Sequence, residues 1–396
     1  MTATEPAIPH PPEAELQFDV HPTEDTLGRM RTLFERHGDV YRAFSPSTQT
    51  WVYVLNHPDA VKRVLVTNHR NYTKGIALAR VRILLGDGIM TSEGDLWKRQ
   101  RRMMQPLFHR RVVAEFGRVI GQANERLIAR WDARAGAGEP VNVTDDVSEL
   151  TLDIVLRAIF GRDLHSLSGQ LGSNPFEVLT KEPARNLQFA YRFRSLTKLV
   201  AQIIRRRRER GEEHLDYIGM LMDVRDKDTG AAMGDRELID EIMTLIVAGH
   251  ETTASALNWT WYLLSQHPEV ERRLHAEIDA LPDEPAPHLP RMERLAYAQQ
   301  VLNEAMRLYP PGWLLSRRSI RADVLGGFSI DGGTDVLLSP YFLHRHPRFW
   351  KDPEAFRPER FDAAHEAERP RFAYMPFAAG PRHCTKYPLY MRLERR

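Results

Sequence analysis

The sequence has a single cysteine among its 396 residues, which excludes an intramolecular disulfide and is typical of a protein in a reducing compartment. It also has no stretch approaching the roughly 18 consecutive apolar residues that a membrane-spanning helix needs. The first residues, MTATEPAIPHPPEAELQF, contain no basic segment followed by an apolar one, so the pattern of a signal peptide is missing. From these absences we expect a cytoplasmic protein without a membrane anchor.

The sequence also has little excess of charge of either sign. Its 55 Lys and Arg residues and 53 Asp and Glu residues leave a formal net charge of +2. This balance argues against a dedicated nucleic-acid-binding protein. The most basic segment is a run of four arginines at residues 205–208, which Glu209, Glu212 and Glu213 follow. No aromatic residue is interleaved with the run, so it favours a solvated helix end over a surface on which bases stack.

The chain shows neither an internal repeat nor a long flexible linker. With 42% hydrophobic and 27% charged residues it can bury a substantial core. Helical periodicity dominates, and short strands are expected near the beginning, as in WVYVL at residues 51–55, and late in the sequence. We therefore expect one domain over residues 1–396, mainly α-helical with a small β-rich part.

The longest periodic element begins near Asp235 and ends before Pro268, which gives a helix of roughly 48 Å at 1.5 Å per residue. Leu238 and Ile242, one turn apart, predict that one face of it is buried. Its middle, AGHETT at residues 248–253, places an acid and two hydroxyls between apolar segments. A buried carboxylate must be paired or protonated, and threonines inside a helix bond the carbonyl one turn back. The set indicates a functional site, although a polar stripe that faces solvent remains an alternative.

Cys384 lies at the end of the segment FAAGPRHC, residues 377–384. A single cysteine in a soluble enzyme is ordinarily an inert buried side chain. Here Gly380 suits a tight turn, Arg382 supplies a cation for an acidic group, and the rest of the segment is mostly apolar. Ligation of haem iron would explain why a loop presents a cysteine in this way, because a cysteine thiolate pushes electron density onto the iron and favours O–O cleavage.

This segment closely resembles the haem-binding signature of the cytochrome P-450 family, which reads Phe, two residues, Gly, one residue, Arg, one residue, Cys, one residue, Gly. Phe377, Gly380, Arg382 and Cys384 occupy the first four positions, and Lys386 stands where the family has its last glycine. The resemblance implies that Cys384 is the axial ligand of the iron in haem b, iron protoporphyrin IX. It also implies that the other three matching residues contact the cofactor.

The string AGHETT resembles the distal helix of the same family, which carries a small residue, Gly, any residue, an acid and Thr beside the haem. On that match Ala248 and Gly249 leave room for O₂ against the cofactor. Glu251 and Thr252 correspond to the acid and the alcohol that relay protons during oxygen activation. Thr253 lies about 100° further around the helix and is expected to be structural.

A third match joins NEAMRLYPP with FRPERF. Glu304 and Arg307 are three residues apart on one helical face, and by themselves they would usually form a surface salt bridge. Together with Arg360 they resemble the family's ExxR pair and the arginine of its PERF motif. The resemblance implies a buried network with the structural role of fixing the cysteine loop.

Haem carries two propionates, so cationic and indole donors are expected near it. Trp97 and Arg101 are four residues apart and match the family's WxxxR contacts to the propionates. Arg382 matches the arginine of the cysteine loop. Arg317 lies at a position similar to the family's remaining propionate arginine, with Arg318 as the alternative.

The helix that carries Trp97 is expected to begin with a capping box formed by Ser92 and Asp95. Its remaining surface carries the cations Lys98, Arg99 and Arg102. An acidic electron donor could dock on these cations, and a solvated face explains them equally well.

The matches run in the family's order from Trp97 to Cys384. They imply the family's mainly α triangular-prism fold with a small β-rich lobe, which holds haem between the distal helix and the cysteine loop. The implied reaction inserts one oxygen atom from O₂ into an apolar small molecule. Electrons would come from a ferredoxin or flavodoxin-type donor with its own reductase, because the sequence contains no reductase domain. Residues 72–90 are expected to roof the pocket.

Several alternatives stay open. The substrate could be a long apolar chain, a terpenoid or a polyketide with one polar end. The protein could also be a haem-binding scaffold without turnover, or a peroxide-driven enzyme, which the intact pair of Glu251 and Thr252 disfavours.

After Cys384 the resemblance stops. The remaining residues read TKYPLYMRLERR, with a charged side chain at Lys386 and a helix-disfavouring ring at Pro388. We therefore expect the chain to lack the family's usual C-terminal helix and β-hairpin, as a frameshifted or truncated product or as a natural variant stabilised by a partner. In that form we expect weak haem retention and little activity.

Overall fold

The computed structural model of the chain describes residues 8–15, 25–109, 112, 114, 116–165, 174–181, 187–211, 216–282, 294–366 and 368–384. The expectations about Lys386 and Pro388 fall outside these residues and stay predictions. The structure groups into two compact units, one within residues 1–80 and 303–384 and the other within residues 81–302. A single domain over residues 1–396 likewise stays a prediction.

The chain is mainly α-helical with a few short strands, as the sequence predicts. The α-helices are α1 (Thr26–His37), α2 (Pro58–Lys62), α3 (Ile76–Leu85), α4 (Gly94–Met104), α6 (Gly117–Gly136), α7 (Val143–Phe160), α9 (Val178–Lys181), α10 (Leu187–Arg210), α11 (Tyr217–Asp223), α12 (Asp235–Gln266), α13 (Pro268–Asp279), α15 (Ala296–Leu308), α16 (Pro340–Leu343) and α17 (Ala363–Glu366). A π-helix, η1 (Arg63–Thr67), and the 3-10 helices η2 (His69–Asn71), η3 (Gln105–Phe108), η4 (Pro175–Glu177) and η5 (Pro358–Phe361) are also present. The strands are β1 (Val40–Ser45), β2 (Thr50–Leu55), β3 (Tyr72–Lys74), β4 (Leu315–Ser319), β5 (Asp323–Leu325), β6 (Phe328–Ile330) and β7 (Asp335–Leu338).

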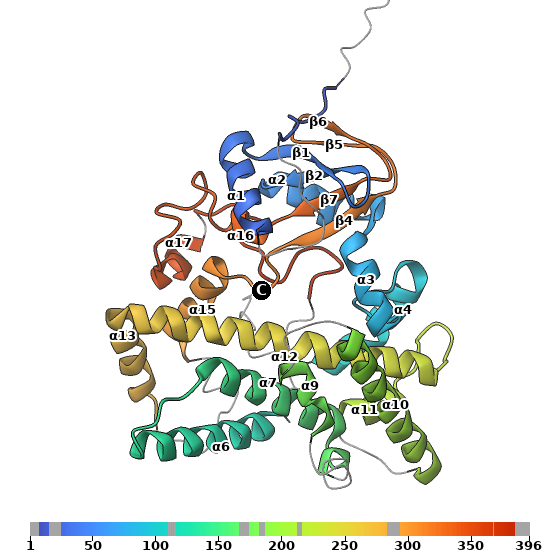
Figure 1. Ribbon diagram of the computed structural model, residues 1–396, viewed down its shortest axis with the longest axis vertical. Helices are drawn as coiled ribbons and strands as arrows, with labels where there is room; N and C mark the ends of the chain where they lie inside the picture. Colours follow the sequence, from blue (N-terminus) through green and yellow to red (C-terminus); the bar gives the residue numbers. More distant parts are fainter. Residues whose placement is uncertain are drawn as a thin grey trace, which may run out of the picture. The chain divides into compact units, whose positions relative to one another are not determined.

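The first unit contains a five-stranded sheet of order β1-β2-β7-β4-β3, and β5 and β6 pair as a separate hairpin (Figure 1). β2 runs antiparallel to β1 and parallel to β7, so strands from the start and the end of the chain lie side by side. Residues 52–55 of β2 are all fully buried. The apolar run of WVYVL is therefore explained by a central strand covered on both faces, and the expected strand is confirmed.

The described residues of the second unit form helices, turns and loops without a strand. Its central element, α12, is a single helix of 32 residues that packs along α7 and against α10 and α11 (Figure 1). Leu238 and Ile242 are fully buried, as their spacing predicts. This confirms both the length and the buried face that the sequence predicts for the longest helix.

The predicted capping box at the start of α4 is wrong. Glu93, rather than Ser92, occupies the N-cap position and makes no side-chain capping bond. The Ser92 hydroxyl instead donates to Oε1 of Gln100 at 2.5 Å, and both side chains are 1% exposed. A buried hydrogen bond therefore takes the hydroxyl that a local cap would have used, because an unpaired polar group is costly in the interior.

The run of arginines at the end of α10 is only partly solvated. Arg205, Arg206 and Arg208 are exposed, as predicted, but Arg207 is 4% exposed. Its guanidinium donates to both carboxylate oxygens of Asp216, at 2.6 and 2.7 Å, and to Asp163 at 2.7 Å. The sequence could not reveal this pairing because the two acids become neighbours of Arg207 only in the tertiary structure.

Candidate functional site

The cysteine lies at the end of a short loop whose backbone closes on itself. The backbone N–H of Cys384 donates to the carbonyl of Phe377 at 2.9 Å, and that of His383 donates to the carbonyl of Gly380 at 3.1 Å. Ala378 adopts a left-handed backbone with φ of 59°. Cys384 itself is exposed. The loop thus presents the thiol outward on a fixed backbone, which contradicts the ordinary expectation of an inert buried cysteine.

Gly380 is required by two features of this loop. Its φ is 72°, in the region that glycine adopts most easily. A β-carbon at this position would also lie 1.7 Å from the carbonyl oxygen of Leu65, which belongs to the π-helix η1. At the tight turn predicted at Gly380, the backbone of the cysteine loop therefore lies in close contact with the backbone of η1.

η1 is held in place by one buried carboxylate, that of Asp323. Its Oδ1 accepts from Arg63 Nη2 at 2.6 Å, and its Oδ2 accepts from Asn68 and Tyr72 at 2.8 Å each. Burial alone would raise the pKa of Asp323, but the hydrogen bonds from Arg63, Asn68 and Tyr72 together lower it. The anion thus fixes both ends of η1, the helix that abuts the cysteine loop.

The predicted network of Glu304, Arg307 and Arg360 is present. Glu304 and Arg307 are fully buried, and two hydrogen bonds of 2.6 and 2.8 Å join them. Arg360 Nε donates to Glu304 at 3.3 Å. Arg307 also donates to the carbonyls of His344 and Pro353, at 2.8 and 2.6 Å. Each charge is therefore paired and hydrogen-bonded, the condition under which buried ions are tolerated.

Sequence reasoning missed His344, which links this network to the cysteine loop. Its carbonyl accepts from Arg307, and its Nε2 accepts from the backbone N–H of Met375 at 2.9 Å. Burial, together with the charges of Arg307 and Arg345, lowers the pKa of His344 to about 3. The ring is therefore neutral near pH 7, so Nε2 can accept a hydrogen bond. The string LHRHP was the available signal, but it does not show which histidine is buried.

The predicted proton-relay residues share one exposed stripe of α12. Ala248, Glu251 and Thr252 are exposed on a helix whose other faces are largely buried, and their spacing of three and four residues places them together. The hydroxyl of Thr252 donates to the carbonyl of Ala248 at 2.9 Å, and that of Thr253 donates to the carbonyl of Gly249 at the same distance. Both threonines therefore bond the carbonyl one turn back, as predicted.

Gly249 lies on a different side of α12 from this stripe. A β-carbon on Gly249 would approach a methyl group of Val155 in α7 to 3.1 Å. The absence of a side chain thus allows α12 and α7 to pack closely. This gives Gly249 a packing role, and its expected role of leaving room for O₂ stays a prediction.

α4 carries Trp97 and Arg101, both half-buried and one turn apart. The other cations of this helix are paired. Lys98 lies 2.9 Å from Asp95, and Arg99 contacts Asp226 at 3.3 Å. Arg102 contacts Asp228 at 2.7 Å, and Arg99 also pairs with Glu237. The basic surface that the sequence suggested for an electron donor is therefore largely neutralised by acids of the same unit.

Of the two candidate propionate arginines in β4, Arg318 is engaged elsewhere. Its Nη1 donates to Asp335 at 2.9 Å. Arg317 is 8% exposed, and its Nη1 donates to the carbonyl of Ser316 at 2.8 Å. Arg318 is thus paired with an acid of its own unit, and the assignment of Arg317 to a propionate stays a prediction.

The residues of the cysteine loop fit a haem. One exposed thiol is held on a closed backbone, an arginine lies two residues before it, and the contact of Gly380 with Leu65 leaves no space for a side chain behind the turn. Within the described residues, no group of three or more His, Cys, Asp or Glu side chains is arranged to hold a metal ion. The thiolate of one cysteine on a closed loop is a donor that haem iron accepts as its protein ligand.

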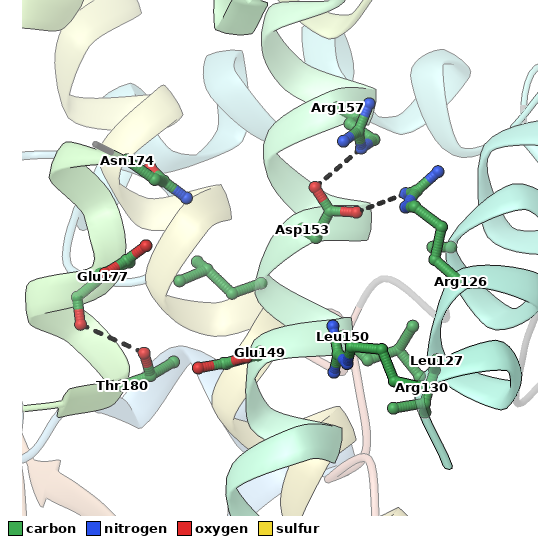
Figure 2. A pocket seen from close by; sticks show the side chains of 12 residues that line it. Arg126, Leu127, Arg130, Glu149, Leu150, Asp153, Arg157, Asn174, Glu177 and Thr180 are labelled. Carbon is green, nitrogen blue, oxygen red and sulfur yellow. Dashed lines mark hydrogen bonds and ion pairs between the residues drawn. The ribbon is translucent and has the colours of Figure 1, made fainter. Parts of the chain in front are cut away.

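The second unit contains a polar cleft of about 260 Å³ among α6, α7, η4 and α9 (Figure 2). Asp153 points toward both Arg126 and Arg157 in this view and accepts from each at 2.7 Å. None of the predicted site residues lines the cleft. Its charged walls do not suit an apolar substrate.

Every helix in the described part of the chain is too short or too polar to cross a membrane.

Comparison with known proteins gives a consistent result. The chain matches the family model described as cytochrome P-450 over residues 12–182 and 172–385. It is 35% identical over 350 residues to cyclooctatin synthase of Streptomyces melanosporofaciens, which covers 84% of this chain and 75% of that protein. It is 32% identical over 367 residues to cyclooctat-9-en-7-ol 5-monooxygenase of the same organism, covering 88% and 78%. It is also 32% identical over 416 residues to the chloroplastic protein LUTEIN DEFICIENT 5 of Arabidopsis thaliana, covering 97% and 69%.

Proposed function

Because the chain belongs to the cytochrome P-450 family of haem-dependent monooxygenases, we propose that it inserts one oxygen atom from O₂ into an apolar organic substrate, with Cys384 as the axial ligand of haem b. The observation that carries the proposal is the exposed thiol of Cys384 on a closed loop, braced at Gly380 by the backbone of η1. When bound, haem would supply the iron on which O₂ is activated.

Cys384 must be a thiolate to act as this ligand. The loop keeps its sulfur in one place through the hydrogen bonds from the backbone N–H groups of Cys384 and His383. The second role of the chain is to hold the cofactor's carboxylates. We assign this role to residues that match the family's propionate contacts and carry the indole and guanidinium donors that propionates need, namely Trp97, Arg101, Arg317 and Arg382.

The stripe on α12 is suited to proton delivery. The hydroxyl hydrogen of Thr252 is directed to the carbonyl of Ala248, which leaves the lone pairs of Oγ1 able to accept a proton or a hydrogen bond. Glu251 is the adjacent exposed acid. We assign Glu251 to supply protons from solvent and Thr252 to pass them on at Oγ1, while Ala248 keeps the stripe free of bulk.

For the substrate we propose an apolar molecule of terpenoid type that carries one polar group. One relative is named for the oxygenation of cyclooctat-9-en-7-ol, an unsaturated alcohol. For the electron donor we propose a ferredoxin or flavodoxin-type protein with its own reductase. Since the cations of α4 are engaged by acids, we propose that the donor docks on the first unit, where Lys62, Arg70 and His383 are exposed near η1 and the cysteine loop.

The test is the spectrum of the reduced protein with CO after reconstitution with haem. A thiolate-ligated haem gives a strongly red-shifted Soret band. We expect this band to be weak in the wild-type chain, because little haem is retained, and we expect Cys384 to be its source. Cys384→Ser should abolish the band, since a serine hydroxyl does not replace a thiolate at neutral pH. His383→Ala, an exposed neighbour in the same loop, is the matched control and should keep it.

An unchanged band in Cys384→Ser would refute the assignment of the ligand. A wild-type protein that shows the band but converts no substrate with electrons or with peroxide would favour the scaffold alternative. Turnover with peroxide alone would favour the peroxide-driven alternative.

A further inference from the structure

The turn between α3 and α4 is clamped by two carboxylates of α12. The backbone N–H of Asp87 donates to Oδ2 of Asp240, and that of Ile89 donates to Oε2 of Glu241, both at 2.9 Å. Asp240 is 5% exposed and Glu241 is fully buried. A buried backbone N–H that loses its acceptor is costly, so these two hydrogen bonds hold the turn against α12.

Two glycines of this connection, Gly86 and Gly88, lie against Asp240 and Thr244 of α12. A β-carbon on Gly86, whose φ is 66°, would lie 2.3 Å from Oδ1 of Asp240. A β-carbon on Gly88 would lie 2.2 Å from Oγ1 of Thr244 and 2.6 Å from the carbonyl oxygen of Asp240. The backbone of the turn therefore rests directly on α12, and neither position has space for a side chain.

Two further hydrogen bonds hold the turn, one within the connection between α3 and α4 and one from α4. The Thr91 hydroxyl, within the connection, donates to the carbonyl of Gly86 at 2.7 Å. Gln100 on α4 donates to the carbonyl of Asp87 at 2.7 Å. The turn is thus a rigid connection from α12 to the helix that carries Trp97 and Arg101, rather than a loop that changes shape freely.

Glu241 lies on the same side of α12 as Ala248 and Thr252, but it is covered by the turn. These residues follow Glu241 by 7 and 11 positions, which at about 100° per residue places all three within about 20° of one line along the helix. Along the axis, Ala248 is roughly 10 Å and Thr252 roughly 16 Å from Glu241. The turn that Glu241 holds therefore closes one end of the stripe assigned to oxygen chemistry.

We propose that Glu241, supported by Asp240, is a positioning residue that fixes the turn at residues 86–90 as an end wall and thereby sets how long an apolar substrate the stripe accepts. This inference rests on the proposed function, because it concerns the substrate of the same site. Ile89 and Met90 are partly buried against the core of the second unit and form the apolar face of the wall. Glu241 itself does not touch the reacting atoms.

The test compares Glu241→Ala with Glu241→Gln. The alanine variant loses the acceptor for the N–H of Ile89. The amide exchange of Ile89 should accelerate by about 10- to 100-fold, because the buried N–H is left without its partner. The glutamine variant keeps an acceptor oxygen at similar reach and should restore most of the protection. Arg236→Ala removes an 80% exposed ion partner of Asp240 and serves as the control with unchanged exchange.

The specificity readout is the spin shift of the haem-loaded protein with geraniol, farnesol and geranylgeraniol, which differ by one isoprene unit each. We expect Glu241→Ala to shift its preference to a longer alcohol than wild type prefers, and Glu241→Gln and Arg236→Ala to keep the wild-type order. Gly88→Ala, which displaces the turn without altering a carboxylate, should shift the preference in the same direction as Glu241→Ala.

Equal protection of Ile89 in wild type and Glu241→Ala would overturn the inference, and so would an identical order of alcohols in the two proteins. If Glu241→Ala does not fold, Gly88→Ala decides by the same alcohol series. A wild-type protein that takes up haem without any spin shift would count against the proposed function. In that case, amide exchange alone judges whether Glu241 positions the turn.

Discussion

The cysteine loop and the exposed stripe of α12 reach functional geometry by different physical routes. The loop consists of irregular backbone that makes a close contact with η1 at Gly380, and we propose that it also depends on the buried ion network and on His344. The stripe consists of side chains on a regular helix whose hydrogen bonds are made within the helix itself. Substitutions in the residues that support the loop should therefore lower both the free energy of unfolding and the retention of haem. Changes on the stripe should cost function alone.

The largest expected effect is at Arg307. Arg307→Ala leaves Glu304 buried without its bidentate partner, which should lower the free energy of unfolding by about 3–5 kcal/mol and reduce haem retention. Urea unfolding and the haem-to-protein absorbance ratio measure the two effects. Arg29→Ala, which breaks an exposed pair with Asp25, should change stability by less than about 1 kcal/mol. Equal urea midpoints for Arg307→Ala and wild type would contradict the proposed dependence of the loop on the network.

A smaller effect, visible in the pH dependence, is expected at His344. Its pKa is lowered from the usual 6.5 to about 3 in the folded protein. Between these two pH values the unfolded chain therefore binds a proton at His344 and the folded chain does not. Stability is therefore complete above pH 6.5 and falls as the pH drops toward 3, by up to about 1.4 kcal/mol per pH unit. His344→Gln should flatten this slope between pH 6.5 and 5, whereas His365→Gln, at an exposed position, should not. Urea unfolding across that pH range gives the slopes, and equal slopes would show that His344 is not the source.

The smallest effect on stability is expected on α12. Thr252→Ala removes an exposed hydroxyl and should change the free energy of unfolding by less than about 0.5 kcal/mol. It should nonetheless raise the peroxide released per electron and lower the yield of product. Thr253→Ala removes the equivalent hydrogen bond on the neighbouring side of the helix and should remain well coupled. Similar coupling in the two variants would remove Thr252 from the proton path.

The two regions also differ in what could be predicted from the sequence. The length of α12, its buried Leu238 and the backward hydrogen bonds of Thr252 and Thr253 follow from helical periodicity, which is local. In the loop, the motif predicted the turn at Gly380, but not that Leu65 of a π-helix makes the glycine necessary. Which atoms meet there depends on segments more than 300 residues apart in the chain, and no local pattern encodes that contact.

The errors have the same origin. Ser92 has the residue type of a helix cap but donates to the buried Gln100. Arg207 lies in a run of charged residues but is buried against Asp163 and Asp216. For Lys98, Arg99 and Arg102 the sequence left a docking surface and a solvated face open, and the structure pairs Arg99 with Asp226 and Arg102 with Asp228. Residue type limits the partners that a side chain can have, and tertiary packing selects among them.

By itself, the sequence determined the helical class, the long central helix and the motifs that carry Cys384, Glu251 and Thr252, because each depends on spacing along a short stretch of chain. Only the tertiary structure decided that His344 connects the buried ion pair to the cysteine loop and that Glu241 holds the turn at Ile89. The physical reason is that burial and hydrogen bonding between distant segments depend on how the chain packs. A buried polar group then accepts the partner that packing brings within reach.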